Sequence, residues 1–385
     1  MYAPQIGTET AAVLPRDGLD SLLAELARQG YEVRGPTLRD GVIVHDALTS
    51  VDDLPRGIGD DQGPGRYRTA SRDDAALFGY AVGPTSAKRE LFPPRQPLWS
   101  AVSVGDADFE IVEAERSSPR VALFGLRPCE LAAIAIQDRV LLHGAVPDEV
   151  YTANRADLLL IGVECGDPAA TCFCTSMGTG PGTDRGADLL LTELLEGEHR
   201  FLLRAPTAAG QAIIEALDTR PATEEDLAAR DGVLQAAEEG MERSLATDEV
   251  HDLLLGNLEH PRWDDIAQRC LACGNCTLVC PTCFCTTVED TTDLAGTSAQ
   301  RERRWDSCFS LDFTHTGPAS VRNTTRARYR QWLTHKLATW IDQFDTSGCV
   351  GCGRCITWCP VGIDLTAEVA TIKRTSEDPA APARS

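Results

Sequence analysis

Eight of the fifteen cysteines in this chain form two runs with the same spacing, Cys-x2-Cys-x2-Cys-x3-Cys-Pro. The first run contains Cys270, Cys273, Cys276 and Cys280, and the second contains Cys349, Cys352, Cys355 and Cys359. Thiolates at this spacing ligate cubane [4Fe–4S] clusters, and where two such runs occur the fourth cysteine of each binds the other cluster. We therefore predict two [4Fe–4S] clusters with crossed ligands, so that Cys359 completes the first site and Cys280 the second.

Zinc and disulfides are the alternatives for these cysteines. A structural zinc site uses four ligands in all, whereas two identical four-cysteine runs, each closed by a proline, exceed that need. Disulfide frameworks are typical of short secreted chains. This chain has 385 residues, and its first residues lack the basic segment and apolar run of a signal peptide. No stretch approaches the ~20 apolar residues of a membrane span. We expect a reduced, cytoplasmic protein that does not enter a membrane.

The net charge of −22 argues against nucleic acid and against an anionic membrane surface as partners. The acidity is uneven, since residues 301–336 contain eight Lys or Arg and three Asp or Glu. These cations have two compatible interpretations. They offset the negative charge of nearby clusters, which we favour, or they dock an acidic partner.

Residues 1–245 have the pattern of an α/β domain. The apolar runs 121–126 and 156–163 are typical of buried strands, and residues 131–142 between them have helical periodicity. A strand, a helix and a strand within about 43 residues predict a βαβ unit with two parallel strands.

Residues 246–385 have a different character and contain five of the six tryptophans. A helical pattern precedes each cysteine run, and the longer one, residues 326–344, carries an apolar stripe at i, i+3, i+4 and i+7. Such a stripe packs a domain and keeps water from a cluster. We therefore predict an α+β protein in which an N-terminal α/β domain is followed by an all-helical two-cluster ferredoxin-like domain.

Seven cysteines lie outside the two runs. Cys129 follows the strand 121–126 and Cys165 follows the strand 156–163, so both are predicted at the carboxyl ends of neighbouring parallel strands, where ligand crevices form. The tetrapeptide Thr-Cys-Phe-Cys also occurs twice, at 171–174 and 282–285. Free cysteines are often small buried hydrophobes, but this placement and this repeat favour a third iron–sulfur site.

Two ligand sets for a third site remain open. Our first choice is Cys129, Cys165, Cys172 and Cys174. The rival joins one Cys-Phe-Cys pair from each domain, so it would draw on Cys283 and Cys285, with Cys308 as a further candidate.

The sequence lacks the fingerprints of nucleotide sites and of common hydrolytic centres. It contains no G-x-G-x-x-G between a strand and a helix and no G-x-x-x-x-G-K-[ST], and its seven histidines form no ligand-spaced cluster. We therefore assign no catalytic residue to this chain.

Five segments resemble one family. They are residues 123–142, 161–181, 270–294, 303–313 and 329–364. The family is that of the iron–sulfur β subunits of cytoplasmic NAD(P)-linked [NiFe] hydrogenases, or sulfhydrogenases, and the ferredoxin-like component of anaerobic sulfite reductase is a more distant relative. The resemblance implies a hetero-oligomer with a large [NiFe] subunit, a small iron–sulfur subunit and a flavin subunit that exchanges electrons with NAD(P). Since this chain has no nucleotide fingerprint of its own, we expect FAD and NAD(P) to bind on that partner subunit.

In such a complex this chain would be a non-catalytic electron-transfer subunit. The alternatives are an equivalent component of another reductase, such as a sulfite reductase, a free enzyme that works at a third cluster, and a scaffold in which clusters only hold the fold.

Overall fold

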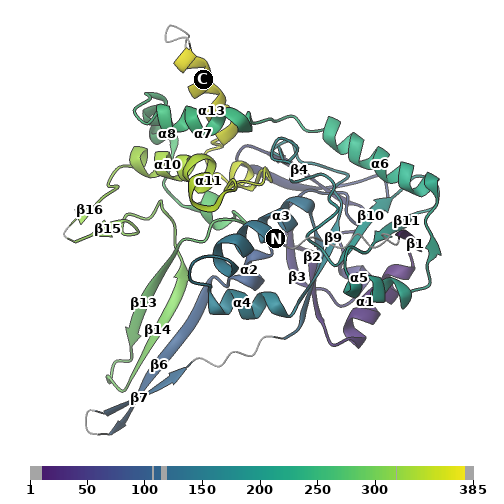
Figure 1. Cartoon of the computed structure of the whole chain (residues 1–385), viewed down its shortest axis with the longest axis horizontal. Helices are drawn as coiled ribbons and strands as arrows, with labels where there is room; N and C mark the ends of the chain where they lie inside the picture. The colour runs from purple at the N-terminus through teal and green to yellow at the C-terminus, as the bar shows by residue number, and fades with distance from the viewer. Residues whose placement is uncertain (1–10, 106–107, 114–118, 318, 378–385) are drawn as a thin grey trace.

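An eight-stranded and a four-stranded β-sheet, two two-stranded sheets and the surrounding helices make up the described part of this computed structural model (Figure 1). The structure describes residues 11–105, 108–113, 119–317 and 319–377. Within these residues no helix combines the length and the apolar character that crossing a bilayer requires.

The larger sheet has eight strands in the order β12-β1-β11-β10-β9-β8-β2-β3. Its strands are β1 (Ala11–Pro15), β2 (Glu32–Arg39), β3 (Val42–Ala47), β8 (Val121–Leu126), β9 (Leu158–Val163), β10 (Leu189–Leu194), β11 (Arg200–Arg204) and β12 (Arg220–Pro221). Strands β2, β8, β9 and β10 are parallel neighbours, and the remaining pairs are antiparallel. The two apolar runs of the βαβ pattern are therefore the adjacent central strands β8 and β9.

Helices cover both faces of this sheet, which explains why its central strands are apolar throughout. On one face, Phe124 and Ile161 pack with α1 and α5. On the other face, Leu123 and Leu160 pack with α2, α3 and α4. The bounds are α1 (Gly18–Arg28), α2 (Lys88–Leu91), α3 (Pro128–Gln137), α4 (Glu149–Ala156), α5 (Ala208–Glu215) and α6 (Glu224–Glu239). A separate hairpin is formed by β4 (Ile58–Gly63) and β5 (Arg66–Ser71).

A helical region follows and carries both cysteine runs. It consists of α7 (Thr247–Gly256), α8 (Arg262–Arg269), α9 (Asn275–Leu278), α10 (Thr325–Thr334), α11 (Trp340–Phe344), α12 (Arg354–Thr357) and α13 (Leu365–Glu377). The helix predicted over 326–344 is present as α10 and α11, joined by a π-helical turn over His335–Thr339. Trp263, Trp332 and Leu333 lie in the hydrophobic core of this helical region.

The C-terminal part also contains strands, which the all-helical prediction did not include. The strands β13 (Thr286–Thr292) and β14 (Ser298–Trp305) form a hairpin, and β15 (His315–Thr316) pairs with β16 (Ala319–Ser320). The strand β14 pairs with β6 (Arg95–Gly105), which in turn pairs with β7 (Asp108–Glu113). These four strands form an arm that projects from the body (Figure 1). The sheet therefore joins the two predicted domains, whose boundary at 245 stays a prediction.

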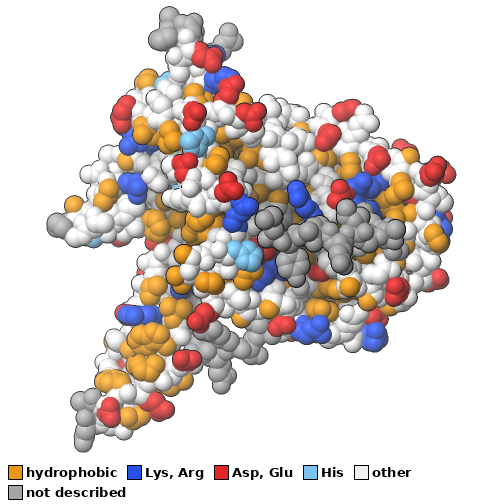
Figure 2. Space-filling view, viewed as in Figure 1, with side chains coloured by type: hydrophobic (Ala, Val, Ile, Leu, Met, Phe, Trp, Pro, Cys, Tyr) orange, Lys and Arg blue, Asp and Glu red, His pale blue; other side chains and the backbone are white. Residues whose placement is uncertain are grey.

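Hydrophobic side chains are exposed on this arm (Figure 2). Val104, Phe109 and Ile111 are 60%, 49% and 62% exposed. The strands β13 and β14 of the arm are polar for most of their length, which is why residues 286–305 gave no strand signal in the sequence.

Candidate iron–sulfur sites

The two cysteine runs fold into loops with the same backbone. In the first run, Ala272 and Gly274 have φ values of 50° and 76°; at the equivalent places of the second, Gly351 and Gly353 have 64° and 72°. These left-handed residues turn each loop so that the peptide N–H two residues after its first cysteine donates to that Sγ at 3.4 Å. A short helix then carries the chain on to the fourth cysteine, α9 in the first run and α12 in the second.

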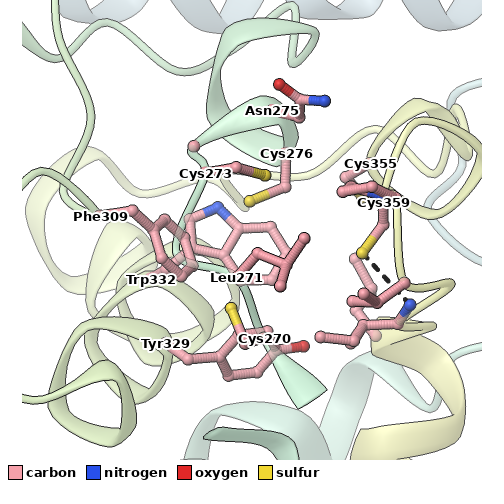
Figure 3. Close-up of a pocket in the computed structure, with 15 residues that line it drawn as sticks. Cys270, Leu271, Cys273, Asn275, Cys276, Phe309, Tyr329, Trp332, Cys355 and Cys359 are labelled. Atoms are coloured by element: carbon pink, nitrogen blue, oxygen red, sulfur yellow. Dashed lines mark hydrogen bonds between the residues drawn. The ribbon is translucent and has the colours of Figure 1, made fainter.

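The thiols of the first run line a cavity with the last cysteine of the second run. The lining cysteines are Cys270, Cys273, Cys276, Cys355 and Cys359. Cys359 faces the three thiols of the first run from the other side, and its Sγ accepts a hydrogen bond of 3.3 Å from the N–H of Ile363 (Figure 3). Phe309, Tyr329 and Trp332 close the cavity with their rings. This grouping is the one that the crossed-ligand prediction requires for the first cluster.

A second cavity joins the thiols of the second run to Cys280. The lining cysteines are Cys280, Cys349, Cys352 and Cys355. Two cations, Lys336 and Arg354, also line this cavity. Both are buried, with 3% and 1% of their surface exposed. The arrangement mirrors the first cavity in its thiols and differs from it in its charge.

The third group of cysteines converges at the carboxyl ends of β8 and β9. Four of its members are the first-choice ligands Cys129, Cys165, Cys172 and Cys174, and the fifth is Cys352 from the second run. Cys129 lies in the first turn of α3, directly after β8, and Cys165 follows β9 by two residues. Arg127 lies beside them and donates to the carbonyl oxygens of Phe78 and Tyr80, both at 2.6 Å.

The two Thr-Cys-Phe-Cys segments hold the second run between them. The hydroxyls of Thr171 and Thr357 are hydrogen-bonded at 2.8 Å, and Thr282 donates to the carbonyl oxygen of Gly348 at 2.7 Å. Both of these tetrapeptide threonines are fully buried. The repeat therefore has a packing function in addition to supplying thiols, and Phe173 lines the second cavity while the cysteines on either side of it line the third.

The donor sets fit iron–sulfur clusters. Five, four and five cysteines line the first, second and third cavities, so each cavity has the four thiols that ligate a [4Fe–4S] cubane. A single zinc ion would need a tighter arrangement, because thiolates bound at about 2.3 Å from one zinc lie about 4 Å from one another. Within the described ranges, no three His, Cys, Asp or Glu side chains are grouped closely enough to bind a single metal ion. Burial raises the pKa of Cys276, Cys355 and Cys172. These thiols therefore need the positive charge of iron to ionise, which couples cluster binding to folding.

The remaining three cysteines lie away from the third cavity. Cys285 and Cys308 are in side-chain contact at the base of the β13–β14 hairpin. Cys283 contacts Cys280, and its carbonyl oxygen accepts a hydrogen bond of 3.2 Å from Lys88. The rival ligand set would need these cysteines beside the first Thr-Cys-Phe-Cys segment, and the cavity there is lined without them.

Several cations of the basic segment 301–336 form ion pairs with carboxylates. Arg301 pairs with Asp290 at 2.6 Å along the hairpin. Arg326 and Arg330 both pair with Glu259, at 3.0 and 2.7 Å. The charge of these arginines is therefore used in local ion pairs, whereas Lys336 points at a thiol.

Lys336 and Arg354 are the site residues that sequence reasoning missed. Lys336 belongs to the basic segment 301–336, but it also lies within the apolar stripe of the helix predicted over 326–344. A cation inside an apolar stripe is the sequence signal that could have indicated a buried lysine with a role in the site. Arg354 is inside the second run itself. It donates to Glu130 at 2.8 Å and forms a buried ion pair that connects α12 to α3.

Comparison with known proteins agrees with this geometry. Residues 269–363 match the family described as a 4Fe–4S dicluster domain. The chain is also similar to the protein named sulfhydrogenase 2 subunit beta from Pyrococcus furiosus. The two are 33% identical over 285 residues, which cover 72% of this chain and 81% of the relative.

Proposed function

The chain belongs to the sulfhydrogenase β subunit family, and we propose that it relays electrons within an NAD(P)-linked [NiFe] hydrogenase complex. [4Fe–4S] clusters, when bound, supply one-electron transfer. We assign the first cluster to Cys270, Cys273, Cys276 and Cys359, and the second to Cys349, Cys352, Cys355 and Cys280. A third is assigned to Cys129, Cys165, Cys172 and Cys174.

The continuity of the three cavities is the observation that carries this proposal. Cys355 lines both the first and the second cavity, and Cys352 lines both the second and the third. Adjacent cavities thus share a lining cysteine. The chain of sites passes from the C-terminal part through the second run into the α/β sheet, as an electron relay between two docked subunits requires.

Residues of this chain exclude water from the cavities and hold the cysteine sulfurs in place. Tyr329 and Trp332 are 3% and 5% exposed and close the first cavity with Phe309. Exclusion of water and hydrogen bonds to the sulfurs are the means by which a protein adjusts such sites. Peptide N–H groups that donate to Cys270, Cys349 and Cys359 supply those hydrogen bonds.

We infer the partner subunits from a reaction that iron–sulfur clusters cannot carry out, the transfer of hydride to or from NAD(P). Hydride transfer to or from NAD(P) needs a flavin that converts electron pairs into single electrons. We therefore propose that FAD and NAD(P) lie on a separate subunit docked against this chain. A small iron–sulfur subunit and a large [NiFe] subunit complete the assembly, and the chain itself reacts with neither hydrogen nor NAD(P).

Anaerobic purification of the native complex tests this function, with mass spectrometry of its subunits and analysis of nickel and iron. Co-purifying flavin and nickel-containing subunits are the expected result. A sulfite-reducing partner without nickel would instead assign the chain to another reductase. Stoichiometric flavin on the isolated chain, or dye reduction by that chain with NAD(P)H, would overturn the relay and favour a free enzyme. Clusters that never change oxidation state would favour a scaffold.

A further inference from the structure

The side chain of Lys336 is aimed at the second cavity from inside the protein. Lys336 lies in the π-helical turn between α10 and α11, a local widening of the helix that often occurs at functional sites. Its Nζ donates to Cys280 Sγ at 3.1 Å, to Thr282 Oγ1 at 3.2 Å and to the carbonyl oxygen of Gly348 at 2.7 Å. All three acceptors belong to segments that hold the second cavity.

The charge of Lys336 is not balanced by a carboxylate. Within the described part of the chain it forms no ion pair with Asp or Glu, whereas Arg354 in the same cavity is offset by Glu130. A buried ammonium is costly unless opposite charge compensates it. Of the three acceptors that Lys336 contacts, the sulfur of Cys280 is the one that can carry a negative charge.

Among the described residues that line the other two cavities, no cation donates to a cysteine sulfur as Lys336 does. Phe309, Tyr329, Trp332 and further apolar residues line the first cavity, and among its described lining residues there is no Lys, Arg or His. Arg127 borders the third cavity, but its guanidinium hydrogen-bonds carbonyl oxygens, among them that of Glu164 at 3.0 Å. Lys336 therefore distinguishes the second site from its neighbours.

We propose that Lys336 raises the reduction potential of the cluster at the second site, so that an electron on the relay resides in its middle. A cubane gains a negative charge on reduction, and a fixed ammonium at hydrogen-bond distance from a ligand sulfur stabilises the reduced form more than the oxidised one. This inference rests on the proposed function, and Lys336 acts as a positioning residue, not as an electron carrier.

The test uses anaerobically loaded full-length protein and a redox titration followed by electron paramagnetic resonance. The second-site signal is identified as the one lost in Cys349→Ser. Lys336→Met keeps the methylene stem and removes the charge; Lys336→Gln keeps a donor and removes the charge; Lys336→Arg keeps the charge. We expect both uncharged variants to shift the second-site midpoint downward by at least a tenfold change in its reduction equilibrium, which is about 59 mV for one electron. The first-site midpoint should stay within error, and Lys336→Arg should stay near the wild type.

The outcomes separate this inference from the proposed function. Lys373→Met is the matched control, since it removes the charge of a lysine that pairs with Glu249 and lines none of the three cavities, and it should leave the midpoint unchanged. Wild-type midpoints in both loaded uncharged variants would overturn the role of Lys336 and leave the relay intact. Loss of the second cluster from both uncharged variants, but not from Lys336→Arg, would also overturn it by assigning Lys336 to cluster assembly. A wild-type protein without any reducible cluster would refute the relay itself.

Discussion

The peptide N–H of Phe173 donates a hydrogen bond of 2.8 Å to the carbonyl oxygen of Gly351. Phe173 belongs to the α/β part of the chain, whereas Gly351 lies inside the second cysteine run. The contact is close enough that a Cβ at Gly351 would lie 2.6 Å from the carbonyl carbon and oxygen of Phe173. The loop between β9 and β10 and the loop of the second run are therefore built against each other, and the third group of cysteines lies directly beside the second.

We expect Gly351→Ala to destabilise the holoprotein by about 1–3 kcal/mol, because the added methyl group overlaps the Phe173 backbone. Anaerobic denaturant unfolding measures this change. The matched control is Ala272→Gly at the equivalent place of the first run, where the same left-handed turn already accepts a methyl group; its change should stay within about 1 kcal/mol. Equal losses in the two variants would show that the contact with Phe173 is unimportant.

Replacement of Cys280 by Ser should damage the cluster of the second run more than that of the first. The reason is geometric, since Cys280 lines the second cavity with Cys349, Cys352 and Cys355, while Cys359 lies at the first. Iron analysis and electron paramagnetic resonance of the variant measure the loss. Cys308→Ser serves as control. An intact second-run signal together with loss of the first would exclude crossed ligation.

Cys165→Ser should remove the third cluster from the full-length protein. Three cubanes require about 12 iron atoms per chain and two require about 8. The variant is preferable to an isolated fragment of residues 1–245, since such a fragment would lack β14, the partner of β6, and Gly351, the partner of Phe173. Unchanged iron content in a folded Cys165→Ser protein would count against this ligand set, and a matching loss in Cys285→Ser would revive the rival set.

Glu164 should make stability depend on pH. Its buried carboxylate accepts hydrogen bonds from Arg204 at 2.8 Å, Arg230 at 2.7 Å and Thr192 at 2.6 Å. Burial raises its pKa, but the bonds from Arg230 and the charge of Arg204 outweigh burial, so the pKa is lowered from the usual 4.5. A carboxyl whose folded pKa is lowered stabilises the protein fully above its unfolded pKa and loses that contribution as the pH falls through the folded value.

Glu164→Gln is therefore expected to cost about 3–5 kcal/mol at pH 7, since it leaves two arginines without their carboxylate. The difference from the wild type should hold down to about pH 5.5 and shrink below pH 4.5. Unfolding curves at several pH values measure it, with the exposed Glu238→Gln on α6 as control. A deficit that does not change with pH would mean that the ionised form of Glu164 contributes nothing specific.

Local signals in the sequence identified the elements that carry the site better than they identified its contacts. The apolar runs of β8 and β9 locate Cys129 and Cys165, because strand burial and the carboxyl-end rule are readable from one segment at a time. The hairpin of β13 and β14 escaped because its residues are polar and its partner β6 lies far away in the chain. The role of Lys336 escaped for the same reason, since its three acceptors come from residues 280–282 and 348.

The pairing of β6 with β14 has a consequence for biosynthesis. Ribosomes add about 5–20 residues per second. The strand β14 is therefore synthesised roughly 10–40 s after β6, because it follows β6 far along the chain. During that interval the edge of β6 that β14 later covers stays unpaired, beside the side chains of Val104, Phe109 and Ile111, which are exposed even in the complete fold. Such an edge invites pairing with other nascent chains. Heterologous production should therefore gain from slower growth or added chaperones, independently of the iron supply.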